Sequence, residues 1–253
     1  MRPAHITEVQ AVMRARYHAA STKHNRAKAL RQILRWLWQY HGAAKLDDQV
    51  NRFASPRPRN VCVTDDEKQR ILAAAAPHVK LWILLCSDLA IRSGTAIALA
   101  PRDYDPARRT LTFTTKCDEH LTLPVTQEIV EMLQACDPQS EMSFVRQLWH
   151  RHHRQTRTRS RLTSCGKNAL GRVFNNLQTQ LGITRHLRPH DFRRTTAVAM
   201  LKATGDIREV QAVLGHKNLQ STFWYLDHDL RPVSRTTLEL LKKPNPRKGP
   251  KCA

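Results

Sequence analysis

The spacing of hydrophobic residues predicts a mostly helical chain. Apolar residues recur every three or four positions through residues 7–41, which is typical of helices with one buried face. In this segment Trp36 and Trp38 are expected to belong to the core. Similar spacing, helped by capping residues, predicts further helices over residues 65–76, 80–90, 127–136, 167–182, 190–205, 206–215 and 233–242.

Several helix ends carry recognisable signals. Thr64 and Glu67 stand at the two positions of a capping box, which pairs an N-terminal hydroxyl with a Glu three residues later. Pro77 is expected to stop the helix that Thr64 begins. Gly182 and Gly205 follow the last periodic residues of two later helices.

Two short segments alternate in the manner of strands. Residues 108–115 and 120–126 are rich in Thr and other β-branched or aromatic residues, and the sequence KCDE between them suits a hairpin turn. The expected fold class is therefore mainly α with a small antiparallel β-sheet.

The chain is expected to contain two parts and a tail. Residues 52–60, RFASPRPRN, are polar, carry Pro56 and Pro58, and show no periodicity, which is typical of a linker. We expect a short helical unit over residues 1–58 and a larger unit over residues 59–242. The last residues, 243–253, are basic and Pro-rich and are expected to be disordered.

Charge favours a polyanionic partner. Lys and Arg number 42 against 21 Asp and Glu, which gives a formal charge of +21. The excess is concentrated in residues 1–58 and 146–194, so double-stranded DNA gripped from two sides would relieve it. A basic protein without such a partner, or one attracted to anionic membrane, is the alternative that charge alone leaves open. The sequence has no apolar run of membrane-spanning length and no signal-peptide pattern at its start, so we expect no membrane partner and a cytoplasmic location.

Cysteine and histidine give no metal or cofactor pattern. The six cysteines form no CxxC pair and no zinc-like cluster, and reduced thiols are expected. His150, His152 and His153 lie in an Arg-rich stretch that would repel a cation, and they are interpreted as a basic surface or loop.

One region carries residues suited to cutting and rejoining a DNA strand. That reaction needs a nucleophile that conserves the phosphodiester energy in a covalent link, cations that stabilise the charge on the phosphate oxygens, and a proton donor for the leaving hydroxyl. His190 and Arg193 are three residues apart and share one face of a helix start. His216 follows the expected helix end at Gly215, and Tyr225 lies nine residues beyond His216.

This pattern resembles the tyrosine recombinases, also called the phage-integrase family. The family combines a His-x-x-Arg motif, a Leu-Gly-His motif and a Tyr nine residues later, and this chain has HDFR at 190–193, LGH at 214–216 and Tyr225 in that order. An earlier family segment matches residues 87–105, with Arg92, Leu99 and Asp103. The hairpin turn supplies Lys116 at the place of the family's catalytic Lys. The resemblance covers about residues 60 to 242.

The resemblance implies a role for each matching residue. Tyr225 would attack the scissile phosphate and form a 3′-phosphotyrosyl link, and Arg92 and Arg193 would hold the phosphate oxygens. His190 would assist proton transfer, Lys116 would protonate the leaving 5′-hydroxyl, and His216 would hydrogen-bond the phosphate. No metal or cofactor is implied, and the active form would be a homo-multimer, a tetramer, on two DNA sites.

The sequence departs from the family pattern at two places. Thr95 stands where relatives commonly have an acidic residue that supports the pocket. Only about 58 residues precede the catalytic part, where relatives usually have four or more helices, so a truncated or minimal DNA clamp is expected. The helix expected after Tyr225, with Val233, Leu238 and Leu241 as its apolar stripe, could dock on a neighbouring subunit or cover its own core.

Other functions compete with recombination. A catalytically impaired, DNA-binding remnant of an integrase would keep the motifs. A type IB topoisomerase would share the phosphotyrosyl chemistry but act as a monomer. A basic nucleoid protein would account for the charge but leave the ordered motifs without a cause. The target site, and the choice between integration, excision and resolution, cannot be read from the residues.

Overall fold

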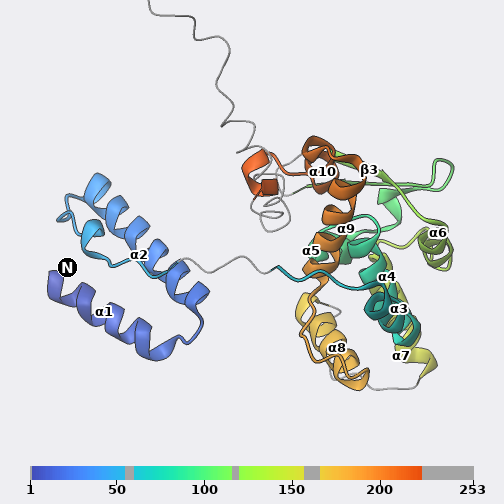
Figure 1. The fold of residues 1–253 in the computed structure, drawn as a ribbon, viewed down its shortest axis with the longest axis horizontal. Helices are drawn as coiled ribbons and strands as arrows, with labels where there is room; N and C mark the ends of the chain where they lie inside the picture. The colour runs from blue at the N-terminus through green and yellow to red at the C-terminus, as the bar shows by residue number, and fades with distance from the viewer. Residues whose placement is uncertain (1, 55–59, 116–119, 157–165, 224–253) are drawn as a thin grey trace, which may run out of the picture. The chain divides into compact units, whose positions relative to one another are not determined.

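The chain folds into two compact units, Met1–Arg59 and Asn60–Ala253. The computed structural model describes residues 2–54, 60–115, 120–156 and 166–223. Helices predominate, and the described strands form one three-stranded antiparallel sheet (Figure 1), which confirms the predicted fold class. Among the described helices, none has the length and hydrophobicity that crossing a membrane requires.

The first unit is a pair of helices followed by a short turn. Helix α1 spans Pro3–Arg16, α2 spans Ala20–His41, and the 3-10 turn η1 spans Asp47–Gln49. Arg35 on α2 reaches the buried Asp47 carboxylate at 3.0 Å. Side chains from α1, α2 and the segment around η1 form a small core, consisting of Ile6, Ala27, Leu34, Leu46 and Val50.

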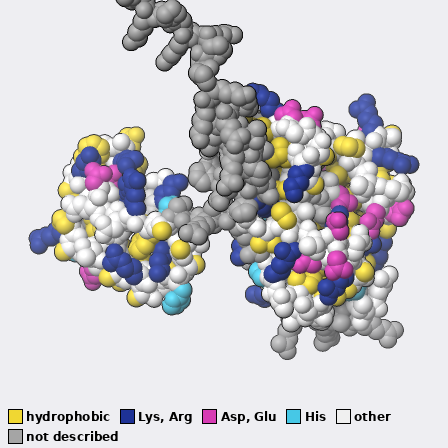
Figure 2. Space-filling model, in the orientation of Figure 1, with side chains coloured by type: hydrophobic (Ala, Val, Ile, Leu, Met, Phe, Trp, Pro, Cys, Tyr) yellow, Lys and Arg dark blue, Asp and Glu magenta, His cyan; other side chains and the backbone are white. Residues whose placement is uncertain are grey.

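The two tryptophans of α2 lie outside this core, so the expectation for them is wrong. Trp36 is 51% exposed and Trp38 is 43% exposed. Trp36 comes two residues after the buried Leu34, which places it about 200° around the helix from the core. The Trp38 ring is approached by the ammonium of Lys45 at 5.3 Å. Figure 2 shows hydrophobic side chains among Lys and Arg on the visible face of this unit.

The second unit is built around α4, Pro77–Ser87, a helix buried over nearly its whole length. It packs against α3 (Asp65–Ala74), α7 (Phe144–Gln155), α8 (Lys167–Gln180) and α9 (Pro189–Thr204). Three aromatic rings fill the contact between α4, α8 and α9: Trp82 meets Phe174 edge-on at 6.2 Å, and Phe174 meets Phe192 at 6.0 Å. The core therefore sits directly beneath the start of α9.

The predicted capping box at the start of α3 is confirmed. Thr64 accepts a hydrogen bond from the Glu67 backbone N–H at 3.2 Å, and Glu67 accepts one from the Thr64 N–H at 2.8 Å. Glu67 also pairs with Arg185, which lowers the pKa of its carboxyl to about 2. This ion pair joins α3 to the segment that leads into α9. The helix ends at Ala74, before Pro77, and Pro77 begins α4.

The sheet contains the predicted hairpin and one strand that was not predicted. Strand β2, Thr110–Thr114, pairs with β3, His120–Pro124, in the register Thr112↔Thr122. The added strand β1, Tyr104–Asp105, is only two residues long and pairs with β2 on the other side. The hairpin turn, residues 116–119, lies outside the described residues.

Shorter elements complete the second unit. Helix α5 spans Ser93–Ala98, α6 spans Gln127–Gln134, α10 spans Ile207–Leu214, and the 3-10 turn η2 spans Pro101–Asp103. Gly182 and Gly205 follow α8 and α9 with φ of +66° and +68°, the left-handed conformation expected at helix ends. The expected helix at 233–242 and the tail lie outside the described residues.

The histidines interpreted as a basic surface or loop belong to helix α7, where His150 is exposed and His152 and His153 are half-buried, so the loop alternative is wrong. This helix was not predicted because most of its residues are polar. Helical spacing is nevertheless present in its buried hydrophobic residues, Phe144, Val145, Leu148 and Trp149. His152 and His153 pack beside His78, with ring centroids 5.4 and 6.0 Å from it.

His78 is a buried neutral base in this cluster. Its side chain is on α4, the residue is 2% exposed, and neither ring nitrogen has a hydrogen-bond partner among the described residues. Burial, followed by the positive charges that His152 and His153 carry when protonated, lowers the pKa of His78 from 6.5 to about 3. The unfolded chain would therefore take up a proton that the folded chain refuses, between about pH 6.5 and pH 3.

We predict that replacing His78 by Phe removes part of the acid sensitivity of the fold. At pH 5 the refused proton costs the folded state about 2 kcal/mol relative to pH 8, a cost absent from the variant. Urea denaturation followed by circular dichroism at both pH values measures the difference. Equal losses of stability in wild type and His78→Phe would contradict the assignment, and His5→Phe, at an exposed position, is the matched control.

Candidate active site

The start of α9 fixes the position of His190 and Arg193. Pro189 is the first residue of the helix, where its missing N–H costs no hydrogen bond. The segment before it is held by the buried Gln178 of α8, whose side chain accepts from the Leu187 N–H at 2.7 Å and donates to the Leu187 carbonyl at 3.0 Å. This two-point contact sets where the helix begins and hence where its first turn points.

Arg193 is a buried cation that joins three segments. The residue is only 2% exposed. Its guanidinium donates to the carbonyl of Ala90, in the loop between α4 and α5, and to the carbonyl of Leu214 at the end of α10, the latter at 2.7 Å. The same nitrogen that reaches Leu214 lies 3.4 Å from Nε2 of His216. Because the guanidinium is planar and rigid, these contacts leave its orientation little freedom.

Arg92 approaches the same turn from the other direction. It is the residue immediately before α5, and its Nη2 lies 3.5 Å from the Gly215 carbonyl, a long hydrogen bond. The next residue, Ser93, accepts a hydrogen bond from the Trp82 indole at 3.1 Å, which anchors this end of α5 to the core. Arg92 and Arg193 thus hold neighbouring carbonyls of one turn.

His216 emerges from that turn and is held on both sides. Its Nδ1 lies 3.0 Å from the hydroxyl of Thr222, a fully buried residue, and its backbone carbonyl accepts from Gln211 at 2.8 Å. A guanidinium can only donate, so the contact with Arg193 makes Nε2 the acceptor of the neutral ring. Nδ1 then carries the proton and donates to Thr222.

Desolvation, and after it the positive surroundings, lowers the pKa of both histidines. Desolvation, followed by the charges of Arg193 and Arg92, lowers the pKa of His216 to about 4. His190 retains exposed surface, yet desolvation and then Arg193 lower its pKa as well. Neutral imidazoles can accept protons, and a bound phosphate would offset the repulsion that now disfavours their charged forms.

Gly215 is required both by its backbone angle and by a close neighbour. Its φ is +55°, and a Cβ built at this position would lie 2.8 Å from the Cγ2 of Thr115. Thr115 is buried and directly follows strand β2. The contact therefore presses the end of β2 against the turn whose carbonyls Arg92 and Arg193 hold.

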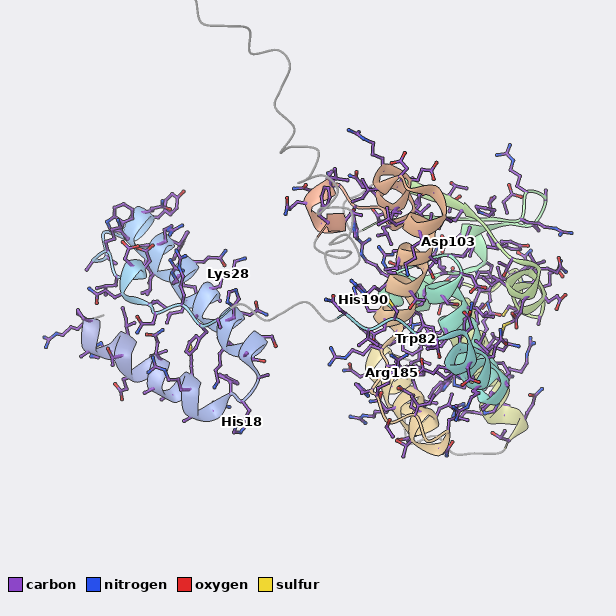
Figure 3. All side chains as sticks on the ribbon, viewed as in Figure 1. His18, Lys28, Trp82, Asp103, Arg185 and His190 are labelled. Atoms are coloured by element: carbon purple, nitrogen blue, oxygen red, sulfur yellow. The ribbon has the colours of Figure 1, made fainter. Side chains whose placement is uncertain are left out.

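The structure brings together four of the six residues predicted for the site. Arg92, His190, Arg193 and His216 converge on the start of α9 and the turn after α10. Figure 3 shows His190 in the second unit near Trp82. Asp103 has a local role, since its carboxylate accepts from the Ala100 N–H at 2.9 Å.

Two predicted residues, Lys116 and Tyr225, lie outside the described residues. The chain is helical again over residues 219–223, just before Tyr225. Thr95, the departure from the acidic family residue, lies in α5 and is partly buried. The described part of the chain contains no group of His, Cys, Asp or Glu able to hold a metal ion.

Sequence reasoning missed Thr115, Gln178 and Thr222. Thr115 lies against Gly215, Gln178 makes two hydrogen bonds to the backbone of Leu187, and Thr222 contacts the ring of His216. A lone Thr or Gln carries no periodic signal in the sequence. Thr222 alone has a usable signal, because it lies between the histidine and the tyrosine of the recognised motifs.

The family model of the phage integrase family matches residues 62–231 of this chain. That match spans the whole site, from the segment before α3 to beyond Tyr225. The chain belongs to the phage integrase family.

Curated relatives of the chain are tyrosine recombinases. Tyrosine recombinase XerC of Haemophilus influenzae (strain PittEE) is 35% identical over 100 residues, which cover 39% of this chain and 29% of the relative. Tyrosine recombinase XerC of Chlamydia pneumoniae is 24% identical over 160 residues, covering 59% of this chain and 46% of the relative. The chain thus spans less than half the length of these relatives.

Solved structures share the fold at low sequence identity. The XerH site-specific recombinase bound to its difH substrate in a pre-cleavage complex has a TM-score of 0.60 at 16% identity, covering 92% of this chain and 69% of that one. The Tn1549 transposon integrase in complex with circular intermediate DNA has a TM-score of 0.58 at 14% identity, covering 94% and 85%.

We predict that Gly215→Ala lowers the free energy of unfolding of the second unit by about 2 kcal/mol or more. Left-handed backbone is costly for a residue with a Cβ, and the added methyl group would collide with Thr115. Urea denaturation measures the loss. Adding Thr115→Ser, which deletes the Cγ2 methyl, should recover the steric share and leave the backbone share. No recovery in the double variant would show that the close contact is unimportant.

Proposed function

We propose that this chain performs site-specific DNA recombination, cutting and rejoining strands through a 3′-phosphotyrosyl intermediate. The observation that carries the proposal is the convergence of Arg92, Arg193 and His216 on one turn, beside His190 at the start of α9. Two guanidiniums and two neutral imidazoles suit a phosphate in transition, since charge builds on its non-bridging oxygens.

The proposed cleavage conserves the number of phosphate ester bonds. The Tyr225 phenol oxygen forms a bond to the scissile phosphorus, and the bond from phosphorus to the 5′-oxygen breaks. The phenol gives up its proton with help from His190, and the leaving 5′-oxygen takes one from Lys116. Attack by a 5′-hydroxyl of the partner strand reverses these steps and completes the exchange. The energy of the broken ester is kept in the covalent link, so no external energy source is needed.

In this proposal the arginines divide two tasks. Arg92 is half-buried and makes one long contact, so its guanidinium can turn toward a phosphate. Arg193 is buried and holds two carbonyls, so it shapes the pocket while it lends its charge. The negative charge of a bound phosphate favours protonation of Nε2 of His216, and that N–H then donates to a phosphate oxygen while Nδ1 stays on the Thr222 hydroxyl.

The proposed partner is double-stranded DNA, bound by a multimer of this chain that pairs two sites. A formal charge of +21 and basic blocks in both units support a polyanionic partner. We propose a cytoplasmic location, where such a protein would meet its DNA.

We predict that Tyr225→Phe abolishes covalent trapping while leaving DNA binding intact. The probe is a nicked suicide duplex made from DNA that adjoins the gene, which lets the cleaved end diffuse away. Wild type should give a protein–DNA adduct that survives denaturing electrophoresis, and Tyr225→Phe should give none, because the phenol oxygen is the nucleophile. The same change at another tyrosine, Tyr17→Phe in the first unit, is the matched control.

The outcomes separate the competing functions. An undiminished adduct with Tyr225→Phe would contradict the nucleophile. Absence of any wild-type adduct would favour a DNA-binding remnant. Relaxation of supercoiled plasmid by the protein as a monomer would favour a type IB topoisomerase.

We predict that Arg92→Gln lowers the rate of adduct formation about 100- to 1000-fold, the usual effect of removing one donor from a transition-state oxyanion. Because Arg92 makes one long contact, the variant should keep wild-type circular dichroism and denaturation. Arg193→Ala is a poorer test, since it would also free the carbonyls of Ala90 and Leu214. A rate within a few-fold of wild type for Arg92→Gln would remove this residue from the proposed mechanism.

A further inference from the structure

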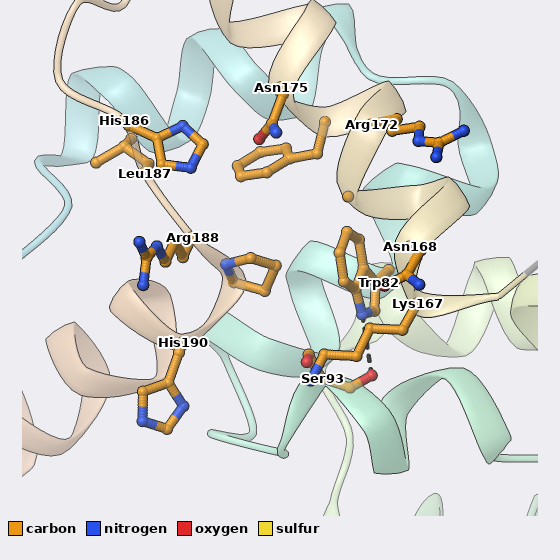
Figure 4. A pocket seen from close by; sticks show the side chains of 13 residues that line it. Trp82, Ser93, Lys167, Asn168, Arg172, Asn175, His186, Leu187, Arg188 and His190 are labelled. Atoms are coloured by element: carbon orange, nitrogen blue, oxygen red, sulfur yellow. Dashed lines mark hydrogen bonds between the residues drawn. The ribbon is translucent and has the colours of Figure 1, made fainter. Parts of the chain in front are cut away.

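A cavity of about 560 Å³ opens beside His190, on the side facing α8. Its walls come from Trp82 in the middle of α4, the start of α5, helix α8 and the segment that leads into α9. Figure 4 shows Lys167 extending below Trp82 toward Ser93, while Arg172 and Arg188 stand at opposite rims. The cavity is therefore continuous with the proposed site. His190 belongs to the site and also lines the cavity, and Ser93, which lines the cavity, directly follows Arg92.

The polar groups around this cavity are donors and cations. Three of its lining residues are always positive at neutral pH, Lys167, Arg172 and Arg188, and all three are exposed. Asn168 and Asn175 add amide groups, and none of the residues lining the cavity is acidic. Helices α8 and α9 both start at this wall, so their first-turn N–H groups add partial positive charge.

Lys167 is electrically coupled to the proposed site. Desolvation, Arg193 and Arg92 lower the pKa of His190, the ammonium of Lys167 adds to that effect, and Asp191 acts against it. The net direction is still downward, so the cations around His190 outweigh the one carboxylate, and a further anion would be attracted there. The scissile phosphate is already served by Arg92, Arg193 and His216 on the other side of His190.

We propose that this cavity binds a second DNA phosphate, the one next to the scissile phosphate on the cleaved strand, with Lys167 and Arg188 as its ligands. The proposal rests on the proposed function, which sets the scissile phosphate beside His190. Successive phosphates along a strand are separated by one nucleotide, and the cavity adjoins the site directly. Holding the neighbouring phosphate fixes the direction of the strand across the site, so both residues are positioning residues and neither takes part in bond making.

The test removes the charge from protein and DNA separately and then together. The trapping duplex is prepared with a single neutral methylphosphonate at each position around the cleavage point, and adduct formation is timed with wild type, Lys167→Gln and Arg188→Gln. At one position next to the scissile phosphate, the methylphosphonate should slow wild type about 10-fold and slow Lys167→Gln less than 2-fold. At all other positions both proteins should show equal effects.

The matched control is Lys202→Gln. Lys202 is an exposed cation on the same helix as His190, twelve residues and about 18 Å further along it. This variant should keep the wild-type pattern of methylphosphonate effects. The proposal would be overturned if a methylphosphonate slowed adduct formation by wild type, Lys167→Gln and Arg188→Gln equally at every position. It would also be overturned if Lys202→Gln showed the same loss of sensitivity as Lys167→Gln.

A binding measurement separates this proposal from the proposed chemistry. On an unmodified duplex, Lys167→Gln and Arg188→Gln should each reduce the slope of log affinity against log salt concentration by about one, the effect of losing one phosphate contact, while Lys202→Gln should not. If wild type forms no adduct but these slopes fall, the cavity holds phosphate and the cleavage chemistry is wrong. Unchanged slopes in both variants would reject the phosphate site, whatever the adduct assay shows.

Discussion

The buried guanidinium of Arg193 is the interaction on which the proposed site depends. It donates to the carbonyls of Ala90 and Leu214, and so ties α9 to the loop before α5 and to the end of α10. A charge placed in the interior is costly unless its hydrogen bonds are satisfied, and carbonyl oxygens satisfy it without neutralising it. The group therefore remains fully positive beneath the surface.

The same arrangement explains why three distant motifs have to occur together. Arg92 comes before α5, Arg193 lies in α9, and His216 follows α10, yet all three meet at the turn of Leu214 and Gly215. That turn needs a residue without a Cβ, because Gly215 has positive φ and touches Thr115. The glycine of the Leu-Gly-His motif is thus a packing requirement, and the histidine after it is placed by that packing.

The candidate site residues Arg92, His190, Arg193 and His216, and the local signals for helix starts and strands, could be predicted from the sequence. Contacts between distant segments could not. Thr64 and Glu67, three residues apart, predict a helix start without any distant contact. The alternating pattern of residues in β2 and β3 predicts the two strands in the same way. Helix α7 was missed because its many histidines and arginines obscured the helical spacing of its four buried hydrophobic residues. Trp36 was wrongly assigned to the core because the type of a residue does not show which face of its helix packs against the core. The family resemblance supplied the roles of His190 and Tyr225, but it carries no information about Gln178 or Thr222, which act only once the chain has folded.

The electrostatics of the site make most sense if its final component comes from outside the chain. Arg92, Arg193 and Lys167 surround His190, and Arg92 and Arg193 also act on His216, so positive charge faces positive charge over a short distance. Desolvation, and after it the guanidinium charges, lower the pKa values of the two histidines. At other places in the second unit a carboxylate pairs with a cation, as Glu67 does with Arg185 and Asp88 with Lys68. Asp191 raises the pKa of His190 without cancelling the net lowering, and a bound phosphate backbone would offset the repulsion that is left. Folding stability and DNA binding are thereby linked. The more the repulsion among the cations of the empty site lowers the free energy of unfolding, the more its relief adds to the free energy of DNA binding.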